Sequence, residues 1–338
     1  MNHVKVGIIG AGRIGSLHAA SLVTRIPKAE VVAIADVRRA VAERCAAELG
    51  IPEVYGDPEP IVDHAGIDAV LICSSTDTHA ALIEAAAGAG KHIFCEKPID
   101  LDLARVDRVL AAVEAAGVTM MVGFNRRFDH NFRRVRELVE AGAVGEPQLL
   151  HIISRDPSPP PLDYVKVSGG IFLDMTIHDF DMARYLMGAD VVELYAEGGV
   201  MVDPAIGEAG DIDTAVITLR FENGAIGTID NSRQAVYGYD QRAEVFGSRG
   251  AVRTENDFPN TALLSDAASV RRDLPLNFFM DRYTESYVEE LRAFVDCLLE
   301  GREPPTTGQD GRIAIAMGYA ARKSYDEHRP VRVKEVLL

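Results

Sequence analysis

The twelve residues 4–15, VKVGIIGAGRIG, decide the fold of this chain. The apolar run Val4–Ile9 is followed by a G-x-G-x-x-G pattern over residues 10–15, and a helical pattern begins inside it at Ile14. In such a strand–turn–helix the first glycine permits the tight turn, the second lets the backbone approach a pyrophosphate, and the third lets helix pack on strand. Backbone N–H groups at the positive helix end can then hold the anion. Alone the hexapeptide is weak evidence, because glycine turns also occur in other doubly wound proteins.

Asp36 strengthens the nucleotide interpretation. It follows the apolar run Val31–Ala35 and lies 21 residues after Gly15, about where a ribose-binding carboxylate is expected. A carboxylate accepts hydrogen bonds from ribose hydroxyls and repels a 2′-phosphate, so NAD is the predicted cofactor rather than NADP. Arg38 and Arg39 could stack on adenine or tolerate a phosphate, which leaves the strictness of that preference open. The candidate cofactor-binding residues of this region are Gly10, Ala11, Gly12, Arg13, Ile14, Gly15, Asp36, Val37 and Arg38.

The first third of the chain alternates strand-like and helical runs, which indicates a parallel, doubly wound (Rossmann) sheet. The predicted strands are Val4–Ile9, Val31–Ala35, Ala69–Cys73, His92–Cys95 and Thr119–Val122, and the helices between them are Ile14–Thr24, Ala40–Leu49, His79–Ala89 and Leu103–Ala116. The later part predicts an α/β domain with a largely antiparallel sheet. Its strands are Gln148–Ser154, Val191–Glu197, Thr214–Phe221, Ala225–Ser232 and Ala243–Gly247, with helices at Phe132–Ala141, Tyr283–Leu299 and Arg312–Glu327. We place the domains at residues 1–123 and 124–338.

Composition excludes several classes of function. A length of 338 residues suggests about two domains, and an apolar fraction of 47% is ordinary for a protein with buried cores. The net charge of −16 argues against nucleic-acid and anionic-membrane partners. No apolar run is long enough for a membrane helix, and the N-terminus does not resemble a signal peptide. The four cysteines are scattered, which favours a reducing cytoplasm over a disulfide framework.

Three polar residues form a candidate catalytic set. Lys97 directly follows the fifth predicted strand, where ligands of open α/β sheets bind, although a solvated Glu96–Lys97 pair is the plain alternative. Asp174 and His178 are four residues apart in a run that is helical from Asp174 onward, with Gly188 as its stop, so they share a face. Alcohol oxidation needs a hydride acceptor, which a nicotinamide supplies, and a base, for which His178 oriented by Asp174 is suited. Lys97 would stabilise the alkoxide-like charge, and we expect no metal.

The motifs GAGRIG (10–15), EKP (96–98) and DMTIHD (174–179) together resemble the glucose-fructose oxidoreductase / inositol dehydrogenase family over essentially the whole chain. Residues 123–129, 154–157, 169–179, 237–242 and 279–283 resemble bacterial inositol dehydrogenases of that family more specifically. The resemblance implies a Rossmann domain plus an α/β domain whose open sheet mediates assembly, commonly into a homotetramer. It also implies NAD-dependent oxidation of the axial hydroxyl of myo-inositol to 2-keto-myo-inositol.

The resemblance also implies roles for individual residues. The catalytic positions are Lys97, Asp174 and His178; further cofactor-contacting positions are Ser74, Ser75, Thr76, His79, Glu96 and Lys97; the polyol-binding positions are Lys97, Asn125, Arg127, Arg155, Asp156, Asp174, His178, Tyr237 and Tyr283. Some family members carry Met at the position of Asn125 and Asn at that of Asp156, which leaves the preferred stereoisomer open. The Pro157–Pro161 stretch before Tyr164 is either a loop over the pocket or a rigid connector.

Three alternatives to this interpretation stay open. A sister dehydrogenase would act on scyllo- or chiro-inositol or on an aldose. A glycosidase that uses NAD transiently would release sugar without accumulating NADH. A nucleotide-sensing scaffold would have no chemical need of Lys97, Asp174 and His178 together.

Overall fold

The computed structural model describes residues 3–337, so residues 1, 2 and 338 at the outer ends of the predicted domains lie outside the described part. The chain forms two compact units. Unit 1 contains Met1–Phe128 and Glu285–Ile313, and unit 2 contains Asp129–Thr284 and Ala314–Leu338. Each unit has its own sheet.

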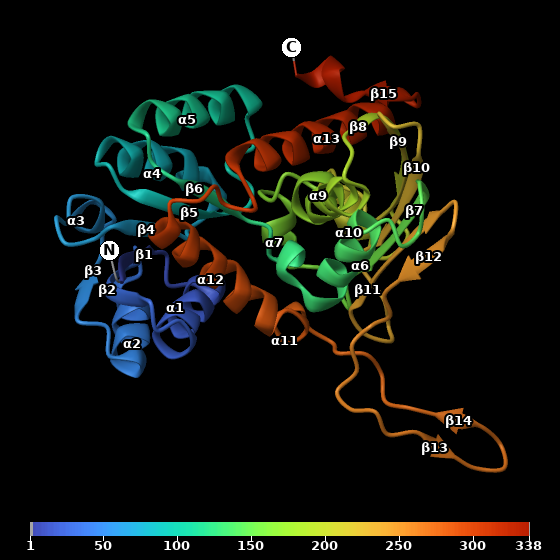
Figure 1. Cartoon of the computed structure of the whole chain (residues 1–338), viewed down its shortest axis with the longest axis horizontal. Helices are drawn as coiled ribbons and strands as arrows, with labels where there is room; N and C mark the ends of the chain where they lie inside the picture. Colours follow the sequence, from blue (N-terminus) through green and yellow to red (C-terminus); the bar gives the residue numbers. More distant parts are fainter. Residues whose placement is uncertain (1–2, 338) are drawn as a thin grey trace. The chain divides into compact units, whose positions relative to one another are not determined.

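Unit 1 contains a parallel sheet of six strands in the order β3-β2-β1-β4-β5-β6 (Figure 1). The strands are β1 (Val4–Ile9), β2 (Ala29–Ala35), β3 (Glu53–Tyr55), β4 (Ala69–Ile72), β5 (His92–Glu96) and β6 (Met120–Gly123). This is the order of a dinucleotide-binding Rossmann sheet, which confirms the predicted fold class. The carboxyl ends of β1, β2, β4 and β5 carry the residues that the sequence assigns to the cofactor.

Helices cover both faces of this sheet. They are α1 (Arg13–Arg25), α2 (Arg39–Leu49), α3 (Glu59–Val62), α4 (Thr76–Gly88), α5 (Leu103–Ala116) and α12 (Thr284–Glu300), with a 3-10 turn η1 (Asn125–Phe128). In Figure 1, α4 and α5 lie over one face, and α1, α2 and α12 lie on the other. Local chemistry fixes the bounds of α5, because the Asp102 carboxylate caps its start by accepting from the Ala104 N–H and Gly117 ends it at φ 64°.

Helix α12 belongs to unit 1, although it follows most of unit 2 in the sequence. Val288, Leu291, Phe294 and Val295 point from this helix into the core formed by α1, α2 and the strands. The boundary predicted from sequence assigned this stretch to the second domain. The difference arises because an apolar helix face shows that a helix is buried but does not identify the sheet that buries it.

Unit 2 contains a mixed sheet of seven strands in the order β12-β11-β7-β10-β9-β8-β15. The strands are β7 (Pro147–Arg155), β8 (Val191–Gly199), β9 (Thr214–Phe221), β10 (Ile226–Ser232), β11 (Asp240–Gly247), β12 (Gly250–Arg253) and β15 (Val331–Arg332). Strands β7 and β10 pair in parallel, and the other neighbours are antiparallel. The predicted open, largely antiparallel sheet is confirmed.

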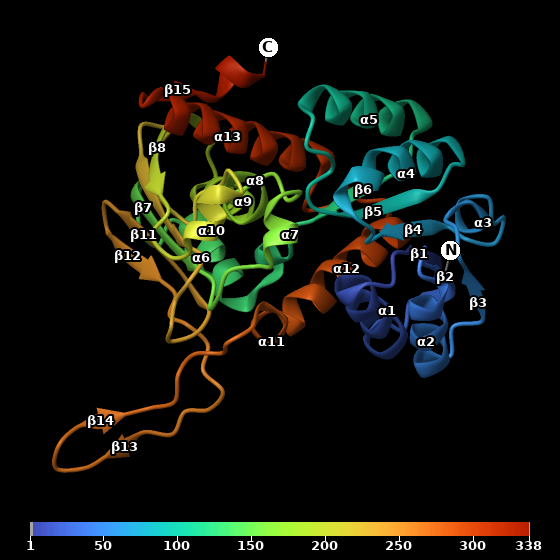
Figure 2. The ribbon, with the colours of Figure 1, turned by 180° about the vertical axis from the view of Figure 1, so that it is seen from behind.

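Helices pack on one face of this sheet (Figure 2). They are α6 (His130–Glu140), α7 (Leu162–Val165), α8 (Ile171–Asp174), α9 (Thr176–Met187), α10 (Pro204–Glu208) and the part of α13 (Gly308–Glu327) that lies after Ile313, with α11 (Phe279–Arg282) and the 3-10 turn η2 (Val333–Val336) completing the unit. The inward residues of β9 are buried in strict alternation with outward ones, as expected for a sheet covered on one side.

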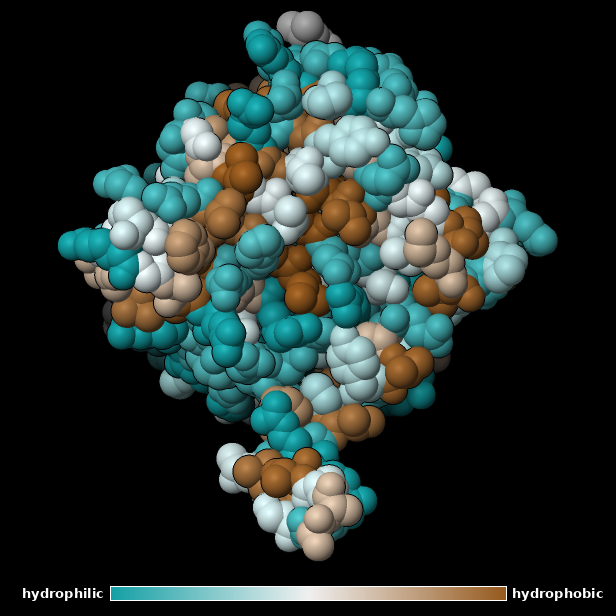
Figure 3. Space-filling model, turned by 90° about the vertical axis from the view of Figure 1, so that its right-hand side faces the viewer, coloured by the Kyte–Doolittle hydropathy of each residue, from teal (hydrophilic) through white to brown (hydrophobic). Residues whose placement is uncertain are grey.

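The opposite face of the sheet, which we call the outer face, is open to solvent and partly apolar. Its exposed side chains include Val216, Ile226 and Phe246, which are 50%, 51% and 42% exposed. Figure 3 looks toward this side of unit 2 and shows hydrophobic side chains among polar ones. An arm of residues 255–278, with the short strands β13 (Leu264–Ser265) and β14 (Val270–Arg271), projects from unit 2 in Figures 1 and 2. Among residues 3–337, no helix combines the length and the hydropathy needed to cross a membrane.

Candidate active site

The glycine loop between β1 and α1 has three glycines with different tasks. Gly10 has φ +98°, and a Cβ there would lie 2.6 Å from the backbone of Cys73. A Cβ on Gly15 would lie 1.8 Å from the carbonyl oxygen of Gly10. A Cβ on Gly12 would meet no atom within 4 Å. Two glycines are therefore required by the fold itself, whereas the third keeps the backbone open on the ligand side.

The start of α1 provides hydrogen-bond donors for an anion. Gly12 is its N-cap, no side chain caps the helix, and its first turn contains no acidic residue. An N-terminus without a side-chain cap can direct backbone N–H groups at an anion, and the helix dipole favours negative charge there. Together with the open side of Gly12, this arrangement fits the pyrophosphate of a dinucleotide.

Asp36 is fixed at the carboxyl end of β2. Its Oδ2 accepts from the Ala11 N–H and its Oδ1 accepts from the Arg38 N–H, both at 2.8 Å. The carboxylate is 8% exposed, whereas the Arg38 side chain is 72% exposed with its Nε 3.7 Å from Oδ1. Val37 between them is 86% exposed. The loop therefore presents a rigid carboxylate with lone pairs to spare for ribose hydroxyls.

A buried histidine holds the segment after β4 in place. Ser74 shares a hydrogen bond of 2.6 Å with Thr78, and Ser75 and Thr76 form the start of α4. His79 is 1% exposed, and its ring nitrogens lie 2.8 Å from the Pro98 carbonyl oxygen and 3.1 Å from that of Ser74. The structure thus places His79 in the interior, where it ties the loop after β4 to the loop after β5.

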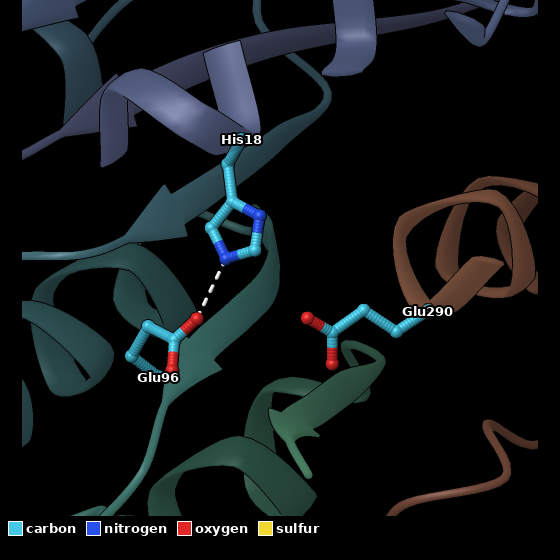
Figure 4. Close-up of side chains that lie close together, drawn as sticks. All are labelled: His18, Glu96 and Glu290. Carbon is cyan, nitrogen blue, oxygen red and sulfur yellow. Dashed lines mark hydrogen bonds and ion pairs between the residues drawn. The ribbon is translucent and has the colours of Figure 1, made fainter. Parts of the chain in front are cut away.

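Glu96 and Lys97 stand at the carboxyl end of β5, and both are half-buried. Glu96 Oε1 lies 2.6 Å from Nε2 of His18, which is fully buried on α1. Figure 4 shows the Glu290 carboxyl of α12 directed toward this pair. The ligand atoms of the three side chains lie within 4.8 Å of one another. His18 therefore holds the Glu96 side chain from inside the domain. This contact fixes the carboxyl end of β5, and Lys97 is the next residue.

Glu290 is an unusual member of this cluster. It is 0% exposed, and both carboxyl oxygens are buried without a hydrogen-bond partner among the described residues. Burial, and then the charge of Glu96, raise the pKa of Glu290 well above its ordinary value. Glu290 therefore favours its neutral form more strongly than an exposed carboxyl does.

The turn η1 after β6 holds two predicted substrate residues. Asn125 is 3% exposed, and its buried Nδ2 has no hydrogen-bond partner among residues 3–337. Arg127 donates to the Pro305 carbonyl at 2.9 Å and lies 3.0 Å from the Asp310 carboxylate. Arg127 is thus anchored inside unit 1, whereas Asn125 retains unused donors.

In unit 2, Asp174 and His178 lie on successive helical segments rather than on one helix. The segment α8 ends at Asp174, α9 begins at Thr176, and Gly188 ends α9 at φ 62°. The helix predicted from Asp174 onward is instead divided at Met175, which separates α8 from α9 although its angles, φ −91° and ψ −59°, lie in the right-handed helical region. Both side chains are nevertheless only partly buried, unlike most of their neighbours.

The Asp174 carboxylate is held on both oxygens. The Tyr164 hydroxyl donates to Oδ1 at 2.8 Å, and Nη1 of Arg233 donates to Oδ2 at 2.9 Å. Burial, together with the charge of Asp174, raises the pKa of Tyr164, so the phenol stays protonated and donates. Asp156 also belongs to this group, since its Oδ2 lies 3.9 Å from Nη1 of Arg233.

The other predicted substrate residues of unit 2 lie in two further networks. Arg155 binds the Asp230 carboxylate at 2.5 and 3.1 Å and donates to the Tyr237 hydroxyl, which in turn donates to Asp240 at 2.6 Å. Tyr283 is 2% exposed and stands edge-on to Tyr239, with ring centroids 5.9 Å apart.

Sequence reasoning missed Arg233 and Asp211. Arg233 is 2% exposed although it is a charged residue directly after the predicted strand Ala225–Ser232. The position just after the carboxyl end of a buried strand was the available signal. Nothing local predicts the partners of Arg233, because Asp174 is 59 residues away in the sequence.

Comparison with known proteins shows the family of the chain. Residues 4–124 match the oxidoreductase family with an NAD-binding Rossmann fold, and residues 132–253 match the GFO/IDH/MocA C-terminal domain. The chain is 52% identical over 334 residues to the myo-inositol 2-dehydrogenase of Thermotoga maritima, covering 99% of this chain and 100% of the relative. It is 48% identical to the inositol 2-dehydrogenase of Rhizobium meliloti, covering 98% and 99%.

A solved structure adds a ligand-bound comparison. The scyllo-inositol dehydrogenase of Lactobacillus casei, with bound NAD(H) and scyllo-inositol, superimposes with a TM-score of 0.92. It is 31% identical, and the match covers 98% of this chain and 99% of that one. The similarity therefore extends over both units of the chain.

Proposed function

Because the chain belongs to the GFO/IDH/MocA oxidoreductase family, we propose that it is an NAD-dependent inositol 2-dehydrogenase. It oxidises the axial hydroxyl of myo-inositol to 2-keto-myo-inositol. The observation that carries this proposal is the full-length similarity to the Thermotoga maritima enzyme at 52% identity. Unit 1 binds the cofactor, and the sheet of unit 2 mediates assembly.

The residues of unit 1 fit NAD. Gly12 leaves room for the pyrophosphate, the start of α1 supplies N–H donors, and Asp36 offers fixed acceptors for the ribose. A fixed carboxylate repels a 2′-phosphate, which supports NAD over NADP. When bound, NAD supplies the hydride acceptor that the oxidation requires.

The protein's own task is to remove the hydroxyl proton. We assign His178 as the base, because an imidazole takes a proton near neutral pH and the nearby Asp174 carboxylate stabilises the imidazolium that forms. Lys97 donates to the reacting oxygen and stabilises its developing negative charge. The other assigned residues hydrogen-bond the remaining hydroxyls of the polyol or line the pocket around them, as recognition of a polyol requires. They are Asn125, Arg127, Arg155, Asp156, Tyr237 and Tyr283.

We further infer a homotetramer in the cytoplasm. The outer face of unit 2 supports the assembly, because it exposes apolar side chains on an uncovered sheet. The cysteines support the location, since all four are free thiols and burial raises the pKa of Cys73 and Cys95.

Two alanine variants test the assignment of the catalytic residues. Lys97→Ala and His178→Ala should lower the rate of NADH formation from myo-inositol by about 10²–10⁴-fold, since each removes a group that acts on the reacting hydroxyl. Binding of NADH, followed by its fluorescence, should survive in both. Lys28→Ala, at a surface lysine paired with Asp296, is the matched control and should keep normal turnover. Near-normal turnover in Lys97→Ala and His178→Ala would contradict the assignment.

A further inference from the structure

Arg233 is a buried cation surrounded by carboxylates. Its side chain is 2% exposed, and it follows β10 directly. Three aspartates of unit 2 face its guanidinium: Asp174 at 2.9 Å, Asp156 at 3.9 Å and Asp211 at 4.0 Å. Burial alone would lower the pKa of Arg233, but the charges of the three aspartates and the hydrogen bond to Asp174 together raise it.

The scaffold holds this group of charges in place. The Arg233 N–H donates to the Asp213 carbonyl at 2.8 Å, which fixes the backbone after β10. Asp211 is 7% exposed, and its Oδ1 accepts from the Ile171 N–H at 3.1 Å. The same Asp211 therefore ties Arg233 to the first residue of α8, the segment that ends at Asp174.

We propose that Arg233 is a positioning residue for the oxidation: it holds the Asp174 carboxylate in place so that Asp174 can support His178 as the base. The inference rests on the proposed function. Arg233 acts through Asp174 and takes no proton itself, because a guanidinium stays charged at every accessible pH.

The charges around Asp174 determine in which direction the loss of Arg233 shifts the pH dependence of activity. The cluster consists of Tyr164 from α7, Asp156 after β7, Asp174 at the end of α8, Asp211 before β9 and Arg233 after β10. His178 follows on α9, four residues after Asp174. Three carboxylates share one cation, so the cluster is negative even with Arg233 present. Without that cation, the like charges raise the pKa of the carboxyls, and the more negative surroundings raise the pKa of the His178 imidazole. Both changes lower kcat/KM on the acidic side of its pH profile.

The first measurement is the pH profile of kcat/KM for myo-inositol. In Arg233→Met, the acidic limb should move to higher pH by about one unit or more, and kcat/KM at pH 7 should fall about tenfold or more. Arg233→Lys keeps the charge but loses the planar fork, so its limb should lie between those of Arg233→Met and wild type. Arg282→Met is the matched control, because Arg282 is equally buried and pairs with Asp129 and Asp257 instead. It should lose stability and keep the wild-type limb.

The second measurement requires no turnover. An NMR titration of the His178 imidazole, assigned with His178→Gln, should show a higher pKa in Arg233→Met and a lower pKa in Asp211→Asn, which removes one negative charge. Asp211→Asn keeps the test decisive if Arg233→Met does not fold. An unchanged limb and an unchanged His178 titration in the folded variants would overturn the role of Arg233. Wild-type NADH formation separately tests the proposed function, so the two failures are distinguishable.

Discussion

Asp36 is a single side chain that we expect to determine the preference for NAD over NADP. Its two oxygens are each committed to one backbone N–H, from Ala11 and Arg38, so the carboxylate stays fixed toward the ribose side. Asp36→Ala removes both the ribose acceptor and the charge that repels a 2′-phosphate. We expect NAD binding to weaken by about 10–100-fold, because hydrogen bonds to charged groups contribute about 1.5–3 kcal/mol.

The same substitution should shift the preference toward NADP, since Arg38 is exposed and close enough to meet a phosphate. The ratio of kcat/KM for NAD to that for NADP measures the shift. Asp57→Ala, at a carboxylate not assigned to the cofactor, is the control. An unchanged ratio in Asp36→Ala would remove the assigned role of Asp36.

Sequence predicted residues whose chemistry is local and missed those whose partners are distant. Asp36 was found because its distance from the glycine pattern is characteristic. Arg233 and Glu290 were not found, because a charged residue in an amphipathic or post-strand position is normally solvated. Their burial follows from packing against Asp174 and Glu96, which lie 59 and more residues away.

At the scale of elements, the bounds of a helix could be predicted where a local capping residue marks each end. The bounds of α5 agree with prediction because Asp102 caps its start and Gly117 ends it. The strand β3 was missed because it has only 3 residues, all of intermediate burial. The interruption at Met175 was missed because the sequence keeps a helical pattern through it.

Helix α12 carries an element-scale prediction about pH and stability. Glu290 lies on its buried face, and the pKa of Glu290 is raised in the folded state. A raised carboxyl pKa means that the folded protein binds a proton that the unfolded chain releases. Its contribution is therefore complete below the unfolded pKa of about 4.5 and is lost as pH rises toward the folded pKa.

Glu290→Gln cannot ionise and should lose this part of the pH dependence. Relative to wild type, it should become progressively more stable as pH rises above about 5, in urea unfolding followed by circular dichroism. Glu289→Gln is the control, because the Glu289 side chain, next to Glu290 in the sequence, is 38% exposed and pairs with Arg292. Parallel stability curves for wild type and Glu290→Gln would contradict the buried acid.

At the scale of the whole molecule, the chain completes unit 1 with a segment that comes after most of unit 2. This return could not be predicted, because only long-range packing identifies the sheet that α12 covers. The outer face of unit 2 was expected from resemblance, and the structure supplies its residues. Ile226 lies there between Leu149 and Arg220 of the neighbouring strands.

The proposed tetramer predicts the effect of a charge on that face. Ile226→Asp places a carboxylate in the contact between subunits, where burying it unpaired is costly. Light scattering coupled to size exclusion should show a tetramer for wild type and a smaller species for Ile226→Asp at micromolar concentration. Val23→Asp, at an exposed valine of α1 in unit 1, should remain tetrameric. A wild-type monomer, or an undisturbed tetramer in Ile226→Asp, would contradict the assembly.

The central claim, oxidation of an inositol with NAD, is tested most directly by initial rates of NADH formation. The rates are measured at 340 nm over myo-, scyllo- and chiro-inositol and glucose, with NAD and NADP in parallel. The account predicts net accumulation of NADH, fastest with myo-inositol, and little NADPH. Faster turnover of glucose than of every inositol, or no net NADH from any of them, would contradict it.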